Sequence, residues 1–240
     1  MREIIDHAVR DAVTLEEAGF EAVIVENVSD GPFGSRSMSN QQLAALAVVT
    51  KCVRDRINIE VGIDACGNSI AGIEIASVID NVSFVRIPWY VDVRIGMNGI
   101  VEPNGGDAAW VRKQVGADAV KILADIQIKH TYPLQDAIPI EQSAKWAIDS
   151  KADCIIVTGI TTGAETPIES IRRVKTVSTI PVIAGSGVSG KNYAEQYAAC
   201  DGSIIGSSLK KDGNLMNPVD PELAKQFISN VRSIWKENGK

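Results

Sequence analysis

The sequence predicts an α/β fold, a TIM-type (β/α)8 barrel of parallel strands that lacks the usual first strand at its N-terminus. Short apolar runs alternate with amphipathic segments along the whole chain, an order typical of a parallel sheet covered by helices. The 240 residues of the chain also match one barrel of about 250 residues. We therefore expect a single domain over residues 1–240.

The chain opens on a helix. Apolar residues recur at helical spacing from Ile4 to Leu15, and Gly19 follows as a C-terminal cap, which predicts a helix over residues 2–18. The apolar run EAVIVEN then predicts a strand at 21–27, which leads into a loop rich in Gly, Ser and Pro.

The same alternation continues to the C-terminus. Each further strand is a short run rich in Val and Ile, and each helix is an amphipathic segment that follows such a run. The last helix begins at Pro221, after Asp220 as N-cap, and runs to about Glu237. Between these ends we expect helix 38–55, strand 57–64, helix 69–80, strand 82–88, helix 107–115, strand 118–126, helix 140–150, strand 154–159, helix 166–177, strand 180–187, helix 190–199 and strand 202–208.

An open, doubly wound sheet is the alternative architecture. No G-x-G-x-x-G motif follows the first expected strand, so the signature of a dinucleotide-binding sheet is absent. The near-equal repeats of about 25–40 residues favour the barrel.

Composition indicates an ordinary globular protein, with 45% apolar and 22% charged residues. The net charge of -6 argues against a broad surface for nucleic acid or anionic lipid, although a local positive pocket for a small anion remains open. The four cysteines lie far apart, which fits a reducing cytoplasm. We expect neither a signal peptide nor a membrane span, and hence a cytoplasmic protein that is at most membrane-peripheral.

Two segments rich in Gly and Ser follow the last two expected strands, AGSGVSG at 184–190 and IGSSLKKDG at 205–213. In TIM barrels, the corresponding loops often bind phosphate through backbone N–H groups, although the same residue types also form ordinary tight turns. We predict a phosphate site at these loops. Its residues are Gly185, Ser186, Gly187, Gly206, Ser207, Ser208 and Lys210.

Charged residues occupy the other strands. Residues two apart share one face of a strand, so Lys121 and Asp125 point the same way. We expect that face to line the barrel lumen, because the outer face must pack on apolar helices. Buried ion pairs contribute little to stability, so several of them at the C-terminal ends of strands favour catalysis.

This pattern predicts a mouth of catalytic and binding residues. A buried lysine such as Lys121 can act as a base or a Schiff-base amine. The alternative interpretation of Lys121 is that it belongs to a structural ion-pair network. The expected catalytic residues are Glu26, Asp64, Lys121, Asp125 and His130, and the other mouth residues are Asn27, Asp30, Arg86, Lys129, Thr158 and Thr162. Glu26, Asp64 and Asp125 are also an oxygen-ligand set for a divalent metal such as Mg²⁺.

Several segments together resemble the BtpA/SgcQ family of TIM-barrel enzymes. They are AVIVENVSDGPF at 22–33, VKILADIQIKH at 120–130, TGITTGAET at 158–166, VIAGSGVSGKN at 182–192 and IIGSSLKKDGNLMNPVDP at 204–221. The resemblance implies a barrel of the ribulose-phosphate-binding type. Carried onto matching positions, it implies these shared polar residues: Glu26, Asn27, Asp30, Lys121, Asp125, Lys129, His130, Thr162, Ser186, Ser207, Lys210 and Asp212.

The resemblance also brings out two departures. Family members open with a strand before the first helix, and this chain opens on the helix. The third strand of family members ends in a pattern like L-R-N-D, where this chain reads GIDACGN. The family name is associated with assembly of a photosynthetic membrane complex, and the SgcQ branch with genes for sugar-phosphate uptake.

Two functions remain open. The first is an isomerase, epimerase or lyase for a small phosphorylated sugar or ribosyl compound, in which Asp125 or Glu26 acts as general base and Lys121 stabilises an enolate. It needs no nicotinamide or flavin cofactor. The alternative is a non-catalytic assembly factor for a membrane complex. We expect no nucleic-acid partner and no transmembrane segment, and uncovered sheet edges favour self-association into a homo-oligomer.

Overall fold

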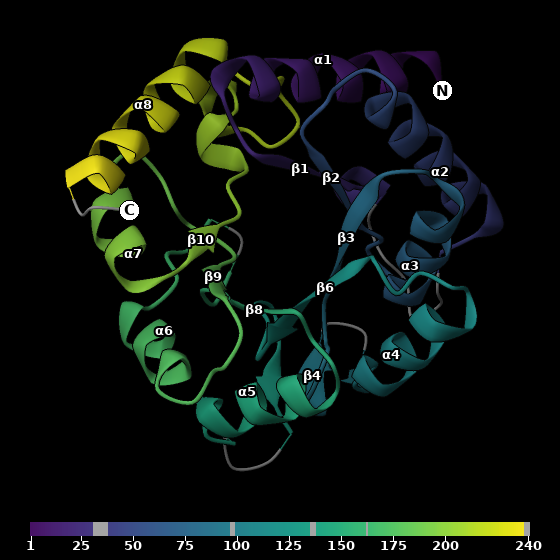
Figure 1. Cartoon of the computed structure of the whole chain (residues 1–240), viewed down its shortest axis with the longest axis vertical. Helices are drawn as coiled ribbons and strands as arrows, with labels where there is room; N and C mark the ends of the chain where they lie inside the picture. Colours follow the sequence, from purple (N-terminus) through teal and green to yellow (C-terminus); the bar gives the residue numbers. More distant parts are fainter. Residues whose placement is uncertain (31–37, 97–98, 135–137, 162, 238–240) are drawn as a thin grey trace.

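The computed structural model describes residues 1–30, 38–96, 99–134, 138–161 and 163–237. Its centre is a parallel sheet whose strands curl into most of a ring, with helices on the outside (Figure 1). In spatial order the strands are β1 (Ala22–Glu26), β2 (Glu60–Asp64), β3 (Val82–Ile87), β6 (Lys121–Ile126), β8 (Cys154–Val157), β9 (Val182–Ala184) and β10 (Gly202–Ser203). Within the described residues this is the expected (β/α)8-type barrel, with seven strands in the main sheet.

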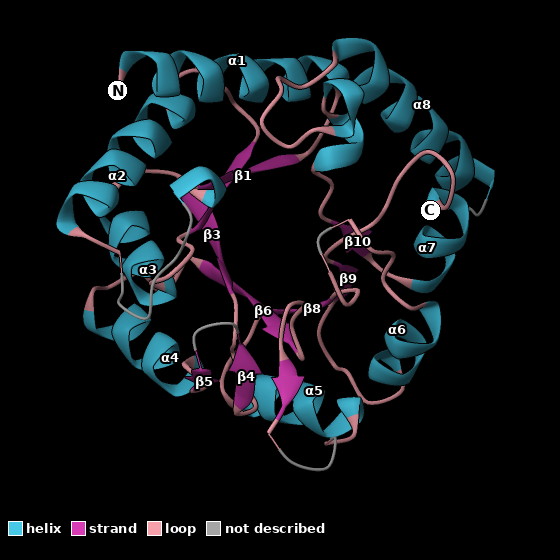
Figure 2. Ribbon diagram, turned by 180° about the vertical axis from the view of Figure 1, so that it is seen from behind, coloured by secondary structure: helices cyan, strands magenta, loops and turns pink. Residues whose placement is uncertain are grey.

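The helices form an outer coat around the sheet, as the view from behind shows (Figure 2). In the described residues they are α1 (Arg2–Ala18), α2 (Asn40–Arg54), α3 (Ser69–Val78), α4 (Gly105–Gln114), α5 (Ile140–Asp149), α6 (Ile168–Lys175), α7 (Tyr193–Ala199) and α8 (Pro221–Glu237). The expected cap of the first helix is confirmed, because Gly19 adopts a left-handed φ of 95° and its N–H bonds to the carbonyls of Leu15 and Glu16.

The two faces of the strands carry different residues. Ile63, Val85 and Ile122 are fully buried and belong to the core that the strands form with the helices. The positions between them face the lumen, where a Cβ on Gly62 would lie 2.1 Å from the ring of Phe84. Glycine at 62 therefore makes room for the Phe84 ring that fills this part of the lumen.

A seam interrupts the ring between β1 and β10. Within the described residues, each of these strands has a single neighbour in the sheet and no strand joins them. A cavity of about 1070 Å³ lies there, lined by residues of β1, β10, α1, α2 and α8, and it reaches into the lumen, where Phe84, Leu123 and Ile183 also line it. Helix α1 crosses the outside of the seam between α2 and α8 (Figure 1). Asp11 of α1 forms an ion pair with Lys210 and accepts a hydrogen bond from the N–H of Val219 at 3.1 Å.

A small antiparallel sheet was not expected from the sequence. It contains β4 (Arg94–Gly96), β5 (Gly99–Val101) and β7 (Tyr132–Pro133) in the order β5-β4-β7. The sequence does carry a signal for it, since an Asn-Gly dipeptide at 98–99 between alternating residues is typical of a tight hairpin. None of the described helices combines the length and the apolar character that a membrane crossing requires.

Candidate active site at the C-terminal ends of the strands

An arginine on β3 lies at the centre of the mouth. The guanidinium of Arg86 donates to Asp125 of β6 through Nε at 2.8 Å and through Nη2 at 3.0 Å. Its Nε also lies 3.6 Å from Oδ2 of Asp64 on β2. All three side chains are at least nine-tenths buried. Burial alone would lower the pKa of Arg86, but Asp125, with Asp64 and Glu26 behind it, raises that pKa, so the guanidinium stays charged.

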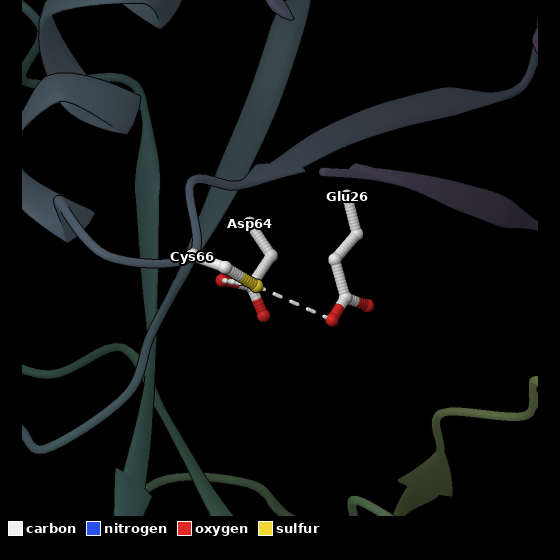
Figure 3. A group of neighbouring side chains, drawn as sticks. All are labelled: Glu26, Asp64 and Cys66. Atoms are coloured by element: carbon white, nitrogen blue, oxygen red, sulfur yellow. Dashed lines mark hydrogen bonds between the residues drawn. The ribbon is translucent and has the colours of Figure 1, made fainter. Parts of the chain in front are cut away.

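Three further groups converge beside this ion pair. Glu26, Asp64 and Cys66 extend toward one another from the ends of β1 and β2 (Figure 3). The thiol of Cys66 donates to Oε1 of Glu26 at 3.4 Å and lies 3.8 Å from Oδ1 of Asp64. The register of the sheet explains why Glu26 and Asp64 lie close together, because the two residues are direct partners across β1 and β2.

Asp64 has a strongly perturbed acidity. Burial raises the pKa of Asp64 to about 8, and the negative charge of Glu26 acts in the same direction while Arg86 opposes both. The carboxyl group of Asp64 is therefore mostly protonated at neutral pH and can donate a proton. A buried acid with such a pKa, placed beside a second carboxylate, is typical of acid–base sites.

The loop after β1 is tied to the loop after β2. The side-chain oxygen of Asn27 accepts a hydrogen bond from the N–H of Cys66 at 2.8 Å, and its amide donates to Asp30 at 3.2 Å. These contacts hold the thiol of Cys66 next to Glu26. Asn27 and Asp30 thus lie at the mouth as expected, where they shape the loop.

A second cation reaches the mouth from the loop after β6. Lys129 is partly buried, and its pKa is lowered by desolvation and by the positive charge of Arg86, while Glu26, Asp125 and Asp64 raise it. Its N–H donates to Oγ1 of Thr158, at the end of β8, at 2.9 Å. Lys129 and Thr158 therefore both lie at the mouth, the position expected for them.

The expected place of Lys121 needs correction. Lys121 is the first residue of β6, so it lies at the opposite end of the strand from Asp125, and its ammonium group lies 3.5 Å from Asp153. Its side chain is 61% exposed, because a residue at the start of a strand reaches the rim. His130 is exposed in the loop after β6, where its N–H donates to the carbonyl of Ile160 at 3.1 Å. Thr162 lies outside the described residues.

The glycine turns after β9 and β10 close the other side of the mouth. Gly187 has a φ of 70°, and a Cβ there would lie 2.3 Å from the carbonyl oxygen of Ala164, so only glycine fits. Within the described chain, the N–H groups of Gly187, Ser207 and Ser208 take part in no hydrogen bond. These groups are available to an anion.

Three of the expected side-chain ligands for phosphate are already engaged. The hydroxyl of Ser186 accepts from the N–H of Gly159 at 3.0 Å and donates to the carbonyl of Ala164 at 3.1 Å. Ser208 donates to the carbonyl of Val188 at 2.9 Å. Lys210 pairs with Asp11, as described above. The turns therefore offer backbone N–H groups rather than these side chains. At Gly185 a Cβ would lie 2.3 Å from the side chain of Ile156, so glycine is needed there, whereas Gly206 has no such close neighbour.

The group of described residues able to hold a metal ion differs from the expected one. Asp125 is engaged by Arg86, and Cys66 takes its place beside Glu26 and Asp64, with ligand atoms within 4.8 Å of one another. Two carboxylates and a thiol suit a borderline ion such as Zn²⁺ better than Mg²⁺. Cys66 was not expected at the site, because its only signal in the sequence is its position two residues beyond Asp64.

Comparison with known proteins yields one family and several relatives. A sequence model of the BtpA family matches residues 1–233. A protein of Pyrococcus furiosus, described as uncharacterized, is 36% identical over 97% of this chain and 87% of its own length. The photosystem I biogenesis protein BtpA of Synechocystis sp. is 28% identical over 94% of this chain and 78% of its own length.

Solved structures share the fold at low sequence identity. One is (S)-3-O-geranylgeranylglyceryl phosphate synthase from Thermoplasma acidophilum, determined in complex with its substrate sn-glycerol-1-phosphate. It aligns with a TM-score of 0.61 and 14% identity, over 95% of this chain and 87% of its own. This similarity supports the barrel architecture independently of the sequence pattern.

Proposed function

The chain belongs to the BtpA family, and from this membership and the geometry of the mouth we propose that it is an enzyme for a small phosphorylated sugar or ribosyl compound. The reaction class is an isomerisation, epimerisation or lyase step that moves protons between carbon and oxygen. A structural neighbour determined with a phosphorylated substrate supports this class of ligand.

One observation carries the proposal. Asp64, 2% exposed and with a pKa raised to about 8, lies against Glu26 at the carboxyl ends of the strands. An acid that is protonated near neutral pH can donate to a carbonyl oxygen, while a neighbouring carboxylate takes a proton from the adjacent carbon. Glu26 is more exposed and fits the second role.

The remaining groups have supporting roles in this proposal. Asp125 accepts two hydrogen bonds from Arg86, so in this proposal neither side chain transfers protons. The pair holds the guanidinium in place next to Asp64. Lys129, with its lowered pKa, replaces Lys121 as the cation that stabilises negative charge on the substrate oxygen. The N–H groups of Gly187, Ser207 and Ser208 would bind the phosphate.

Exchange of substrate protons with solvent tests the proposal. Ribose 5-phosphate and ribulose 5-phosphate are incubated with the protein in D₂O, and NMR follows deuterium at the carbon next to the carbonyl group. We expect exchange with the wild type, at least about a hundredfold slower exchange with Asp64→Asn, and no change with Trp110→Ala, which alters an exposed residue of α4. Exchange at the same rate in Asp64→Asn would contradict the role of Asp64.

A second candidate is an assembly factor that performs no reaction. The name of the Synechocystis relative and the unpaired edges of β1 and β10 in the described sheet favour it. It predicts that Asp64→Asn, which removes the acid but keeps the shape, fully restores the phenotype of a strain that lacks the gene. An enzyme predicts that this variant fails to do so while an equally expressed Trp110→Ala variant succeeds.

A further inference from the structure

A fully buried threonine lies behind the glycine turn that follows β9. The hydroxyl of Thr166 donates to the carbonyl oxygen of Ser186 at 3.0 Å, and the carbonyl oxygen of Val157 lies 3.2 Å away as a second acceptor. Thr166 is 0% exposed, so a ligand in the mouth cannot touch its side chain. Thr166 belongs to the loop between β8 and α6, and Ser186 follows β9, so this hydrogen bond joins two neighbouring loops of the barrel.

The carbonyl that Thr166 binds shares a peptide unit with the N–H of Gly187. A trans peptide is planar, and its C=O and N–H bonds point in opposite directions. The hydrogen bond to the carbonyl of Ser186 therefore directs the N–H of Gly187 away from Thr166. That N–H takes part in no hydrogen bond within the described chain, and it is one of the three N–H groups assigned above to phosphate.

A glycine in this turn lets the peptide unit rotate unless another group holds it. Gly187 has a φ of 70°, but glycine populates negative φ about as readily, so the Ser186–Gly187 peptide could turn over and present its carbonyl oxygen to an anion. Within the described residues, Thr166 is the only hydrogen-bond donor to that carbonyl. The next peptide unit is held separately, because Nδ2 of Asn192 donates to the carbonyl of Gly187 at 2.9 Å. The orientation of the Gly187 N–H thus depends on Thr166.

A buried glutamine on an outer helix holds Thr166 in turn. Nε2 of Gln196, in α7, donates to the carbonyl of Thr166 at 2.8 Å and to Oε1 of Glu165 at 3.1 Å. Gln196 is also 0% exposed, and its own Oε1 has no hydrogen-bond partner in the described part of the chain. A buried oxygen without a partner destabilises a fold. An amide at this position is therefore explained by the two hydrogen bonds that its nitrogen donates.

We propose that Thr166 is a positioning residue for phosphate. Its hydroxyl holds the Ser186–Gly187 peptide with the N–H turned toward the bound anion, and Gln196 holds Thr166 from the side of α7. Neither side chain touches the ligand. The inference rests on the phosphate site of the proposed function, but it does not depend on the proton transfer assigned to Asp64. It means that residues buried behind the turn set the affinity of the mouth for phosphate.

Paired variants of Thr166 test the inference. Thr166→Val removes the hydroxyl and nearly keeps the shape of the side chain, whereas Thr166→Ser keeps the hydroxyl. The full chain is titrated with inorganic phosphate at constant ionic strength, well below the melting temperature of each variant, and amide NMR signals report the affinity. We expect the affinity to fall about tenfold or more in Thr166→Val, because a hydrogen bond to a charged ligand is lost. Thr166→Ser should bind nearly as the wild type does, and Gln196→Met should bind more weakly.

The amide signals of the individual turns separate positioning from a general loosening of the fold. In the wild type, phosphate should shift the signals of Gly187, Ser207 and Ser208. In Thr166→Val the signal of Gly187 should no longer respond, whereas the other two still should. The control is Thr50→Val in α2, which alters another fully buried threonine, one whose hydroxyl has no hydrogen-bond partner in the described residues. It should leave the affinity and all three responses unchanged.

Three results would overturn the inference while phosphate still binds to the wild type. They are an unchanged affinity in a folded Thr166→Val variant, an equal loss in Thr166→Val and Thr166→Ser, and an equal loss in the Thr50→Val control. If Thr166→Val does not fold, an unchanged response of Gly187 in Gln196→Met overturns it. If phosphate shifts none of these signals in the wild type, the phosphate site of the proposed function is wrong, and the inference falls with it.

Discussion

Arg86 and Asp125 form a buried bidentate ion pair although 39 residues separate them, with N···O distances of 2.8 and 3.0 Å. The sheet brings them together because β3 and β6 are neighbours and Arg86 pairs in register with Leu123, two residues before Asp125. The charge of Arg86 is thereby committed to Asp125. Asp64, 3.6 Å away, receives only part of its effect, so burial, with the charge of Glu26, raises the pKa of Asp64.

Breaking this pair should destabilise the protein. Arg86→Met leaves Asp125 buried without a countercharge, and we expect the free energy of unfolding to fall by about 3–5 kcal/mol in urea denaturation. The double variant Arg86→Met, Asp125→Leu should recover most of that loss. The control is Arg173→Met, which breaks an exposed pair with Glu141 and should change stability little. Equal effects of the two single variants would contradict the burial argument.

Stability should fall as the pH rises toward 8. The folded protein holds a proton on Asp64 that the unfolded chain releases near its ordinary pKa of 3.8. The resulting contribution to stability is fully present below pH 3.8 and is lost as the pH passes through about 8. The slope for one proton is at most about 1.4 kcal/mol per pH unit. Denaturation of wild type and Asp64→Asn from acidic to alkaline pH measures it, and parallel curves would refute it.

The thiol of Cys66 should react slowly with alkylating agents. Burial raises the pKa of Cys66, and the charges of Asp64 and Glu26 raise it further. Glu26→Gln removes one of these charges and should speed alkylation by iodoacetamide at this position, as read by peptide mass spectrometry. Cys52, a half-buried free cysteine of α2, serves as the internal reference. An alkylation rate at Cys66 that is the same in the wild type and in Glu26→Gln would argue against the electrostatic effect of Glu26.

Phosphate should stabilise the protein through the turns after β9 and β10. We expect millimolar inorganic phosphate to raise the melting temperature, relative to chloride at equal ionic strength. Ser207→Asp places a negative charge at these N–H groups and should abolish the increase. Thermal melts of both proteins provide the measurement. Stabilisation that persists in Ser207→Asp would mean that phosphate binds elsewhere.

The strands that border the seam should exchange their amide protons fastest. Each has a partner on one side only, whereas β3, β6 and β8 are paired on both. Hydrogen–deuterium exchange by mass spectrometry compares the peptides that contain them. If the edges also mediate self-association, protection of β1 and β10 should increase with protein concentration, and light scattering should detect oligomers. Uniformly slow exchange at low concentration would contradict an open seam.

Much of the fold follows from short-range pattern. All expected helices and all strands of the main sheet are found, because the parallel strands are continuous apolar runs with helices between them. The strands expected at 180–187 and 202–208 are shorter in the structure, where β9 ends at Ala184 and β10 at Ser203. Their glycine and serine residues leave the sheet to form turns.

The site was harder to predict because it depends on register. Alternation alone predicted that Asp64, Arg86 and Asp125 share the lumen face, and Arg86 indeed contacts both acids across neighbouring strands. Alternation cannot say how far along the barrel axis a residue lies, so Lys121 was expected beside Asp125 although it lies at the other end of β6. Nor does alternation reveal which acid forms hydrogen bonds with Arg86, because that depends on the register of β2, β3 and β6.

The seam has a consequence for substrate size. Glu26 and Asp64 extend from β1 and β2 on one side of the seam, and Ser207 follows β10 on the other side. The proposed acids and the proposed phosphate turns are therefore connected through the sheet only by the strands between β2 and β10. A slight widening between β1 and β10 would move these two groups apart while leaving each one intact. The length of the molecule that the mouth can accept would then be set by the helix that spans the seam, and by the Asp11–Lys210 ion pair that anchors it.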